Sequence, residues 1–504
     1  MKTVFLLFDS LNYHALEAFG ATHVHTPHSR RLAERAVRFD KHWAGSLPCM
    51  PARRDLHTGR LNFLHRSWGP LEPFDMSMIA LLQKAGVYTH LVSDHYHYFS
   101  EGGATYHTQY ASFEFVRGQE SDRWKAMVQP PIERFKQQYH PMQTRLEDAR
   151  YLPNLRNREF IKQETDYPIH GCFEKAFEFL DGNRQHDGWL LHLECFDPHE
   201  PFTAPAQYRE RYPTDYRGPV LDWPMYARVN ESPAEIAELR ANYAALVTMC
   251  DTYLGKLLDY FDEHDLWKDT ALVLTTDHGF LLGEHDWWAK NRMPMFNEIS
   301  HLPLMVYHPQ YAHLGGRRVD ALTQTPDLMP TLLDFHGQPA PATARGKSLR
   351  PLLEGATGHH DAVLYGMFGS ATNVTDGRYT YFRYPQDMVK QELYEYTLMP
   401  THLHSFFSPA TLREAQLVRP FDFTQDIPVL KVPARRAQDG QVNPMGTYED
   451  TTTLLFDLEA DPHQLQGYRD AATEQGLLGK LARILGEHDA PAEAYSRIGL
   501  QVPA

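Results

Sequence analysis

The chain has 504 residues, of which 42% are hydrophobic and 12% aromatic, a composition that predicts a buried core and excludes a disordered chain. It carries 49 Lys and Arg residues and 64 Asp and Glu residues, for a formal charge of −15. This balance argues against nucleic acid and against an anionic membrane as partners, because both bind clustered cations, but it leaves a small anionic substrate open.

The first predicted element is a strand over residues 4–8, which ends at Asp9. Its apolar run is too short for a signal peptide, and no stretch approaches the ~18 apolar residues of a membrane span. We therefore expect a cytoplasmic protein without a membrane segment, and an oligomer remains open. The four cysteines are Cys49, Cys172, Cys195 and Cys250. Their spacing shows no pairing, so it predicts neither a disulfide framework nor a zinc site.

Further apolar runs along the chain also end in polar residues. Runs over 89–92, 189–196, 271–276 and 302–307 are followed by Ser93-Asp94, Asp197, Asp277 and His308, respectively. Continuous apolar runs of this length are typical of strands buried on both faces of a parallel sheet. Ligands of such sheets bind beyond the carboxyl ends of the strands, where these polar residues fall.

Helix patterns lie between the runs. A capping box at Ser232 and Glu235 opens a helix with apolar residues at helical spacing up to Phe261. Another helix is expected over 76–85, ending at Gly86. Residues 102–170 show weak periodicity and are expected to cross the sheet as a long excursion. The alternation of strands and helices predicts an α/β fold with a large mixed, mainly parallel sheet between helices, over residues 1–350.

The pattern changes after about residue 346. Strands are expected over 362–368, 378–384 and 451–458, joined by turns, and a helix over 477–485. We therefore predict a smaller subdomain over residues 351–504 with an antiparallel sheet.

The most informative segment is Cys49-x-Pro51-x-Arg53-x4-Thr58-Gly59. A loop that enters a helix with a buried cysteine is the plain interpretation, since free cysteine is usually a small core residue. The pattern, however, resembles the signature of the type I sulfatases of the alkaline phosphatase superfamily. The resemblance implies an alkaline-phosphatase-like fold, and oxidation of Cys49 to formylglycine by a formylglycine-generating enzyme.

The chemistry of a sulfate monoester explains what such a site needs. The ester is a poor electrophile, so hydrolysis requires a strong nucleophile, cations for the charged oxygens and an acid for the leaving group. In the family an aldehyde hydrate on a divalent metal provides the nucleophile.

The resemblance assigns roles to further residues and covers nearly the whole chain. It implies metal ligands at Asp9, Cys49, Asp277 and His278, an orienting Arg53, a sulfate contact at Lys290, and a donor to the leaving oxygen at His199. Segments 325–331, 346–349 and 455–462 match without chemistry of their own. The alternatives are end caps for the two aspartates, and a surface lysine covering an aromatic ring for Lys290.

Two departures from the family pattern affect the site. Many sulfatases have two adjacent acids after the first strand, whereas this chain has Asp9-Ser10. The usual Gly-Lys-Trp-His is replaced by residues 93–98, which brings His95 or His97 within reach of the substrate; for His97 a structural hydrogen bond is an equal alternative. The metal is expected to be Ca²⁺, Mg²⁺ or Mn²⁺, with oxygen ligands and one imidazole favouring manganese slightly.

The leading hypothesis is a formylglycine-dependent sulfatase acting on a small sulfated sugar or an aryl sulfate. A phosphonate monoester hydrolase or phosphodiesterase with the same residues is the alternative, and a non-catalytic binder of sulfo-ligands is a third hypothesis. Residues 113–120 and the aromatic-rich subdomain are expected to line the pocket mouth, since aromatic rings stack on sugars and on aryl groups.

Overall fold

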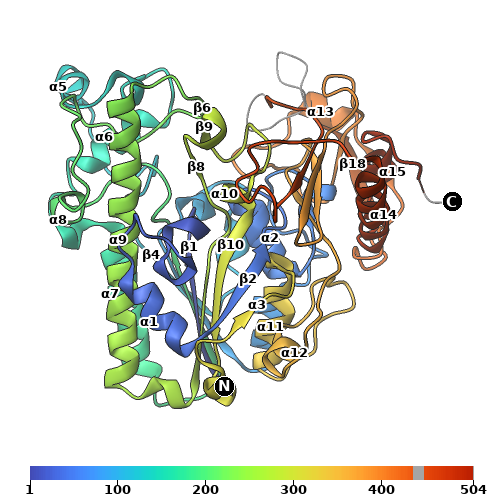
Figure 1. The fold of residues 1–504 in the computed structure, drawn as a ribbon, viewed down its shortest axis with the longest axis horizontal. Helices are drawn as coiled ribbons and strands as arrows, with labels where there is room; N and C mark the ends of the chain where they lie inside the picture. Colours follow the sequence, from blue (N-terminus) through green and yellow to red (C-terminus); the bar gives the residue numbers. More distant parts are fainter. Residues whose placement is uncertain (435–447, 503–504) are drawn as a thin grey trace.

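The computed structural model describes residues 1–434 and 448–502, and its centre is a nine-stranded sheet (Figure 1). The strand order is β11-β2-β10-β7-β1-β5-β3-β4, with β12 beside β2. These strands are β1 (Lys2–Phe8), β2 (Val37–Trp43), β3 (Tyr88–Ser93), β4 (Ser112–Phe115), β5 (Trp189–Cys195), β7 (Thr270–Thr275), β10 (His301–Tyr307), β11 (Arg318–Val319) and β12 (Thr323–Gln324). All pairings except those of β10 are parallel, which confirms the predicted mixed, mainly parallel sheet.

Strand β10 is antiparallel to both of its neighbours, β7 and β2, and this corrects one prediction. We expected His308, which follows this strand, to lie with Asp9 and Asp277 at the carboxyl edge of the sheet. It lies at the opposite edge, because β10 begins where its neighbours end. The error has a physical cause: six of the seven residues of β10 are buried, and such a run looks the same in either direction.

Helices cover both faces of the sheet (Figure 1). One face packs against α1 (Pro27–Arg35), α7 (Pro168–Asn183) and α9 (Pro233–Glu263), and the other against α2 (Cys49–Thr58), α3 (Met78–Lys84), α11 (Leu328–Phe335) and α12 (Arg350–Leu353). Alternate residues of β1 point to opposite faces of the sheet. Val4 and Leu6 belong to the apolar core beneath α1, α7 and α9, and Phe5 and Leu7 belong to the core on the other face. Burial on both faces explains why this strand is apolar throughout.

The predicted start of α9 is confirmed, whereas that of α3 lies two residues later than predicted. Helix α9 begins after Ser232, whose hydroxyl accepts from the Glu235 N–H at 3.4 Å while the Glu235 carboxylate accepts from the Ser232 N–H at 2.7 Å. Helix α3 is shorter than the predicted 76–85, because it begins after Ser77, and Gly86 follows it with a φ of +86°.

The expected excursion over 102–170 has more structure than predicted. It contains α4 (Ala104–His107), α5 (Ile132–Gln138) and α6 (Tyr151–Arg158), and its strand β4 extends the edge of the sheet beside β3. A small antiparallel sheet of β6 (Ala227–Arg228), β9 (Trp287–Ala289) and β8 (Leu281–Leu282) follows later in the chain, with the short helices α8 (Ala206–Arg209) and α10 (Asn297–Ser300). Within the described ranges, no helix has the length and apolar character needed to cross a membrane.

The carboxy-terminal part has the predicted antiparallel sheet, in the order β13 (Val363–Gly366), β14 (Thr372–Thr375), β15 (Tyr379–Arg383) and β19 (Leu454–Asp457). Helix α14 (Ala471–Glu487) packs on it, followed by α15 (Ala492–Ser496). We did not predict β14, nor a second sheet of β16 (Tyr394–Thr397), β18 (Val429–Pro433) and β17 (Gln416–Val418), next to α13 (Pro409–Arg413). The division between residues 350 and 351 stays a prediction.

Candidate active site

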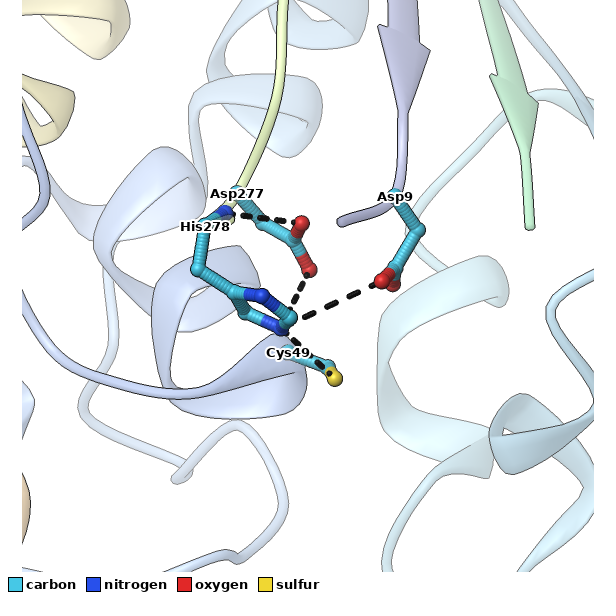
Figure 2. Close-up of side chains that lie close together, drawn as sticks. All are labelled: Asp9, Cys49, Asp277 and His278. Carbon is cyan, nitrogen blue, oxygen red and sulfur yellow. Dashed lines mark hydrogen bonds and ion pairs between the residues drawn. The ribbon is translucent and has the colours of Figure 1, made fainter. Parts of the chain in front are cut away.

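The carboxyl edge of the central strands gathers four potential metal ligands (Figure 2). Asp9 follows β1, and Asp277 and His278 follow the adjacent, parallel strand β7. Cys49 is the first residue of α2, which begins shortly after β2 reaches the same edge. One donor atom from each of the four residues lies within 4.8 Å of the others. The sequence therefore predicted this group correctly as neighbours in space.

The imidazole of His278 lies at the centre of the group. Its Nε2 is 3.0 Å from the Cys49 Sγ, 3.5 Å from the nearer Asp277 oxygen and 3.9 Å from the nearer Asp9 oxygen. Its Nδ1 donates to the carbonyl of Gly279 at 2.9 Å. Because a carbonyl only accepts, this bond places the proton on Nδ1 and leaves the Nε2 lone pair facing the other three residues, as a metal ligand requires.

Arg53 forms hydrogen bonds with both aspartates of this group and with Glu194 of β5. Arg53 lies one turn after Cys49 on α2. Its guanidinium donates to the Cys49 carbonyl at 2.9 Å, to Asp277 at 2.5 Å and to Asp9 at 2.9 Å. Its Nε donates to Glu194 at 2.6 Å. With 1% of its residue surface exposed, Arg53 is held in one orientation by three carboxylates.

Glu194 is a site residue that the sequence analysis missed. It lies within β5, is fully buried, and accepts from Arg53 and, at 2.7 Å, from the Tyr98 hydroxyl. The available signal was an ionisable residue inside an otherwise apolar strand, because a buried carboxylate needs a charged or hydrogen-bonding partner. Burial raises the pKa of Glu194, while Arg53 acts in the opposite direction.

The charges of the site suit a divalent cation. The buried carboxyl groups are Asp9, Glu194, Glu200 and Asp277, and the buried cations are Arg53 and Lys290. Four acids against two cations leave an excess of two negative charges when all are ionised. Burial alone would raise the pKa of Asp9, but Arg53, His278 and Lys290 lower it to about 2. Two carboxylates and one imidazole would be part of a donor set for Ca²⁺, Mg²⁺ or Mn²⁺.

Lys290 reaches the same edge from the segment before β10. Its ammonium donates to the Ser10 hydroxyl at 3.2 Å and lies 3.6 Å from Glu200, and the Ser10 hydroxyl donates to Asp9 at 2.8 Å. Only 3% of Lys290 is exposed, which excludes the alternative of a surface lysine. The hydroxyl of Ser10 thus stands between Lys290 and Asp9, at the position where many sulfatases carry a second acid.

His199 lies on the loop after β5 and is held in one tautomer. Its Nδ1 donates to the Glu200 carbonyl at 2.6 Å. Burial, followed by the charge of Lys290, holds the pKa of His199 well below its usual value. The imidazole is therefore neutral, with its lone pair on Nε2, and it donates from that atom only after gaining a second proton.

His95 and His97 lie after β3 and are both buried. Neither ring nitrogen of His95, nor Nδ1 of His97, has a hydrogen-bond partner among the described residues. The alternative of a structural hydrogen bond is therefore not observed at His97 Nδ1. Burial lowers the pKa of both rings well below the usual value, and Arg53, His199 and Lys290 act in the same direction.

A pair of buried aspartates joins the loops after β3 and β5. Asp94 accepts from the Phe196 N–H at 2.7 Å, and the Gln119 amide donates to both Asp94, at 2.9 Å, and Asp197, at 3.1 Å. Burial raises the pKa of Asp94 to about 7 and that of Asp197 well above its usual value. Gln119 belongs to the segment 113–120 that we expected at the pocket mouth. Its two hydrogen bonds connect that segment to the loops after β3 and β5.

The other cysteines are core residues. Cys172, Cys195 and Cys250 are buried within the apolar core and, like Cys49, form no disulfide. This agrees with the spacing, which predicted no disulfide framework.

The sequence of this chain matches a family model described as Sulfatase over residues 2–337. A second model, described as N-sulphoglucosamine sulphohydrolase, C-terminal, matches residues 283–419. The chain is 26% identical over 374 residues to the multifunctional alkaline phosphatase superfamily protein PehA of Trinickia caryophylli, covering 65% of this chain and 71% of the relative. It is 24% identical over 396 residues to an N-acetylglucosamine-6-O-sulfatase of Bacteroides thetaiotaomicron, covering 70% of each chain.

Two solved structures share the fold. One, described as a complex with its substrate D-glucosamine-2-N,6-O-disulfate, has a TM-score of 0.66 and 16% identity, over 98% of this chain and 99% of the other. The phosphonate monoester hydrolase of Agrobacterium radiobacter has a TM-score of 0.64 and 18% identity, over 96% of this chain and 95% of the other. The family model covers most of the chain and includes the edge where the ligands gather. The chain therefore belongs to the sulfatase family of the alkaline phosphatase superfamily and is a sulfuric ester hydrolase.

Proposed function

We propose that this protein hydrolyses a small sulfate monoester with a formylglycine derived from Cys49 and one divalent metal ion. The observation that carries the proposal is the position of Cys49, at the first turn of α2 and within one group with Asp9, Asp277 and His278. Those four residues would hold the ion, with an oxygen of the modified residue 49 in place of the sulfur. A bound divalent ion would supply positive charge that favours a deprotonated nucleophile.

Residues of the chain would orient the nucleophile and bind the sulfate. Residue 49 lies at the amino end of α2, where the helix dipole favours negative charge. Arg53 holds the carbonyl of residue 49 and would offset charge that develops on the sulfate oxygens. Lys290 is the buried ammonium closest to Ser10 and Asp9 in this arrangement and would bind the sulfate and assist the leaving group.

The proposed donor to the leaving oxygen is His199, with His95 and His97 as substrate contacts. His199 can donate to the leaving oxygen only from Nε2, because its Nδ1 proton is hydrogen-bonded to the Glu200 carbonyl. A bound anionic ester would raise the pKa of His199 and so favour the doubly protonated ring that can donate from Nε2. The unpartnered nitrogens of His95 and His97 support a role as contacts to a polar ligand.

The substrate is proposed to be a small sulfated sugar or an aryl sulfate. A cavity of about 190 Å³ is lined by residues that include Gln119, Arg158, Asp197 and Asp222. It contains none of the four potential metal ligands, and Gln119 and Asp197 connect its wall to Asp94 after β3. From the proposed subdomain over 351–504, the ring of His404 contacts that of His97, with centroids 4.8 Å apart. This contact supports the proposal that the subdomain borders the substrate.

A phosphonate monoester or phosphodiester substrate is the second candidate. It is supported by the single carboxylate after β1, where Ser10 stands in place of a second acid, and the Agrobacterium phosphonate monoester hydrolase shares the fold. The same residues would keep the same roles, because both kinds of ester present a tetrahedral oxyanion. A non-catalytic binder of sulfo-ligands would instead need none of these groups as catalysts.

A paired turnover assay tests the proposal. Protein coexpressed with a formylglycine-generating enzyme is assayed with an aryl sulfate and with the matching aryl phosphonate monoester at a fixed metal concentration. A higher kcat/KM for the sulfate supports the proposal, and a higher value for the phosphonate supports the second candidate. Cys49→Ala should abolish both activities and chelation should abolish them reversibly; turnover that survives Cys49→Ala would refute the nucleophile assignment.

A further inference from the structure

We propose a second metal site, for Zn²⁺, formed by Asp327, His359 and His360. It lies apart from the four ligands of the candidate active site. The three residues each offer a donor atom, and these atoms lie within 4.8 Å of one another. Asp327 ends the 3-10 helix that leads from β12 into α11, and the two histidines precede β13. The site would therefore join residues more than thirty positions apart, on the two sides of the proposed division at residue 350.

The carboxylate of Asp327 is positioned by the backbone around it. One oxygen accepts from the Lys347 N–H at 2.8 Å and the other from the Gln324 N–H at 2.7 Å. The side chain is fully buried. Hydrogen bonds of this kind orient a ligating carboxylate and leave further lone pairs for a cation, because each carboxylate oxygen has two.

The two histidines differ in how they meet this carboxylate. His360 Nε2 lies 2.9 and 3.1 Å from the two Asp327 oxygens and forms hydrogen bonds with them. His359 Nε2 lies 3.2 Å from one oxygen, yet among the described residues it has no hydrogen-bond partner. The side chain of His359 is 4% exposed. At this distance a protonated His359 would form an ion pair with Asp327, whereas the Nε2 lone pair of a neutral His359 would face the carboxylate and could bind a cation placed between them.

His42 adds an independent observation on the adjacent strand β2. Its Nδ1 is bonded to the Thr323 hydroxyl at 3.0 Å, and its fully buried Nε2 has no hydrogen-bond partner in the described ranges. Burial lowers the pKa of His42 to about 3, and Asp327 acts in the opposite direction. His42, on the strand that pairs with β12, is thus a second buried imidazole with an unpartnered nitrogen.

The donor set selects the metal class. Two imidazole nitrogens with one carboxylate are typical of zinc and other first-row transition metals, whereas Ca²⁺ and Mg²⁺ prefer oxygen ligands. Three protein ligands leave a fourth tetrahedral position for water. Since the ligands come from separate segments, bound zinc would stabilise the folded chain.

Zinc titration tests the proposal on the full chain with unmodified Cys49. The candidate active site is first weakened by Asp9→Asn together with Asp277→Asn, which keep the side-chain volumes. A competition titration with a chromophoric chelator should then still show one zinc equivalent, and His359→Gln with His360→Gln on this background should remove it. His140→Gln is the matched control, because His140 also pairs with a carboxylate, Glu235, at 3.2 Å.

Cobalt provides a second measurement if the quadruple variant fails to fold. Co²⁺ added to the Asp9→Asn, Asp277→Asn protein should give visible absorption bands of a four-coordinate site with nitrogen and oxygen ligands, and zinc should displace them. Zinc should also raise the Tm of this protein by several degrees. The proposal is overturned if this folded protein binds no zinc and gives no cobalt bands, or if the variant without His359 and His360 binds zinc equally well.

Discussion

The ammonium of Lys290 donates to the hydroxyl of Ser10, which itself donates to Asp9. Residues 280 positions apart in the sequence are thus joined in one short chain of hydrogen bonds. A serine hydroxyl accepts one hydrogen bond and donates another, whereas a second carboxylate here would only accept. Ser10 therefore positions Lys290 without adding negative charge to the site.

Removal of this hydroxyl should slow turnover. We expect Ser10→Ala to lower kcat/KM by about tenfold, since a hydrogen bond to a charged group contributes roughly 1.5–3 kcal/mol. Ser10 has a φ of +62°, so Ser10→Gly serves as the control that relieves backbone strain while removing the same hydroxyl. Equal kinetic losses in both variants would assign the effect to the hydroxyl. Unchanged kinetics in Ser10→Gly would contradict the positioning role.

Glu194 should control metal affinity through Arg53. When a metal ion binds Asp9 and Asp277, Glu194 is the remaining carboxylate that pairs with the Arg53 guanidinium. In Glu194→Gln, Arg53 should compete with the metal for both aspartates, and metal affinity measured by calorimetry should fall by about tenfold or more. Tyr98→Phe is the matched control, because it removes the other partner of Glu194 and keeps the charge. Equal affinities in wild type and Glu194→Gln would exclude this coupling.

Turnover should depend on the arrangement of the Arg53 donors as well as on the charge of the side chain. Arg53→Lys should reduce kcat by about a hundredfold, because a single ammonium cannot replace the separate donors that reach Glu194, Asp277 and Asp9. Arg54→Lys offers a control on the same helix, where the guanidinium binds Asp75 at 2.7 and 3.1 Å. Steady-state kinetics should show a loss of kcat in the first variant only. Wild-type kcat in the Arg53→Lys enzyme would disprove the orienting role.

Buried histidines should make the fold sensitive to acid. Burial lowers the pKa to about 3 for His42 and His65, and to about 4 for His57 and His301. An unfolded histidine has a pKa near 6.5, so below that pH the unfolded chain binds protons that the folded chain excludes. The stabilising effect is complete above pH 6.5 and is lost as the pH falls toward 3.

Urea unfolding at a series of pH values measures this effect. Each such histidine should contribute a slope of up to about 1.4 kcal/mol per pH unit in the free energy of unfolding, reached near pH 5. His65→Asn removes one buried histidine and should therefore lower this slope by that histidine's share. His313→Asn, at an exposed position, should leave the slope unchanged. A slope that His65→Asn does not alter would contradict the low pKa of His65.

Much of the fold followed from local patterns. The capping box at Ser232, the apolar runs and the break at Gly86 each depend on residues a few positions apart, and the structure confirms the elements that they predicted. The direction of β10 could not be predicted, because burial on both faces makes a parallel and an antiparallel strand equally apolar. Strands β14, β16, β17 and β18 were missed because each of these short segments contains polar residues, so none forms a continuous apolar run.

The sequence by itself determined the family resemblance and predicted that Asp9, Cys49, Asp277 and His278 lie together, because a signature around Cys49 and polar residues after apolar strands are readable along the chain. Only the tertiary structure decided which other groups contact these four residues and their neighbours. Glu194 meets Arg53 across 141 positions, and Ser10 meets Lys290 across 280. Hydrogen bonds and ion pairs act over a few ångströms in space, and nothing in the local sequence shows which distant residues the folded sheet brings that close.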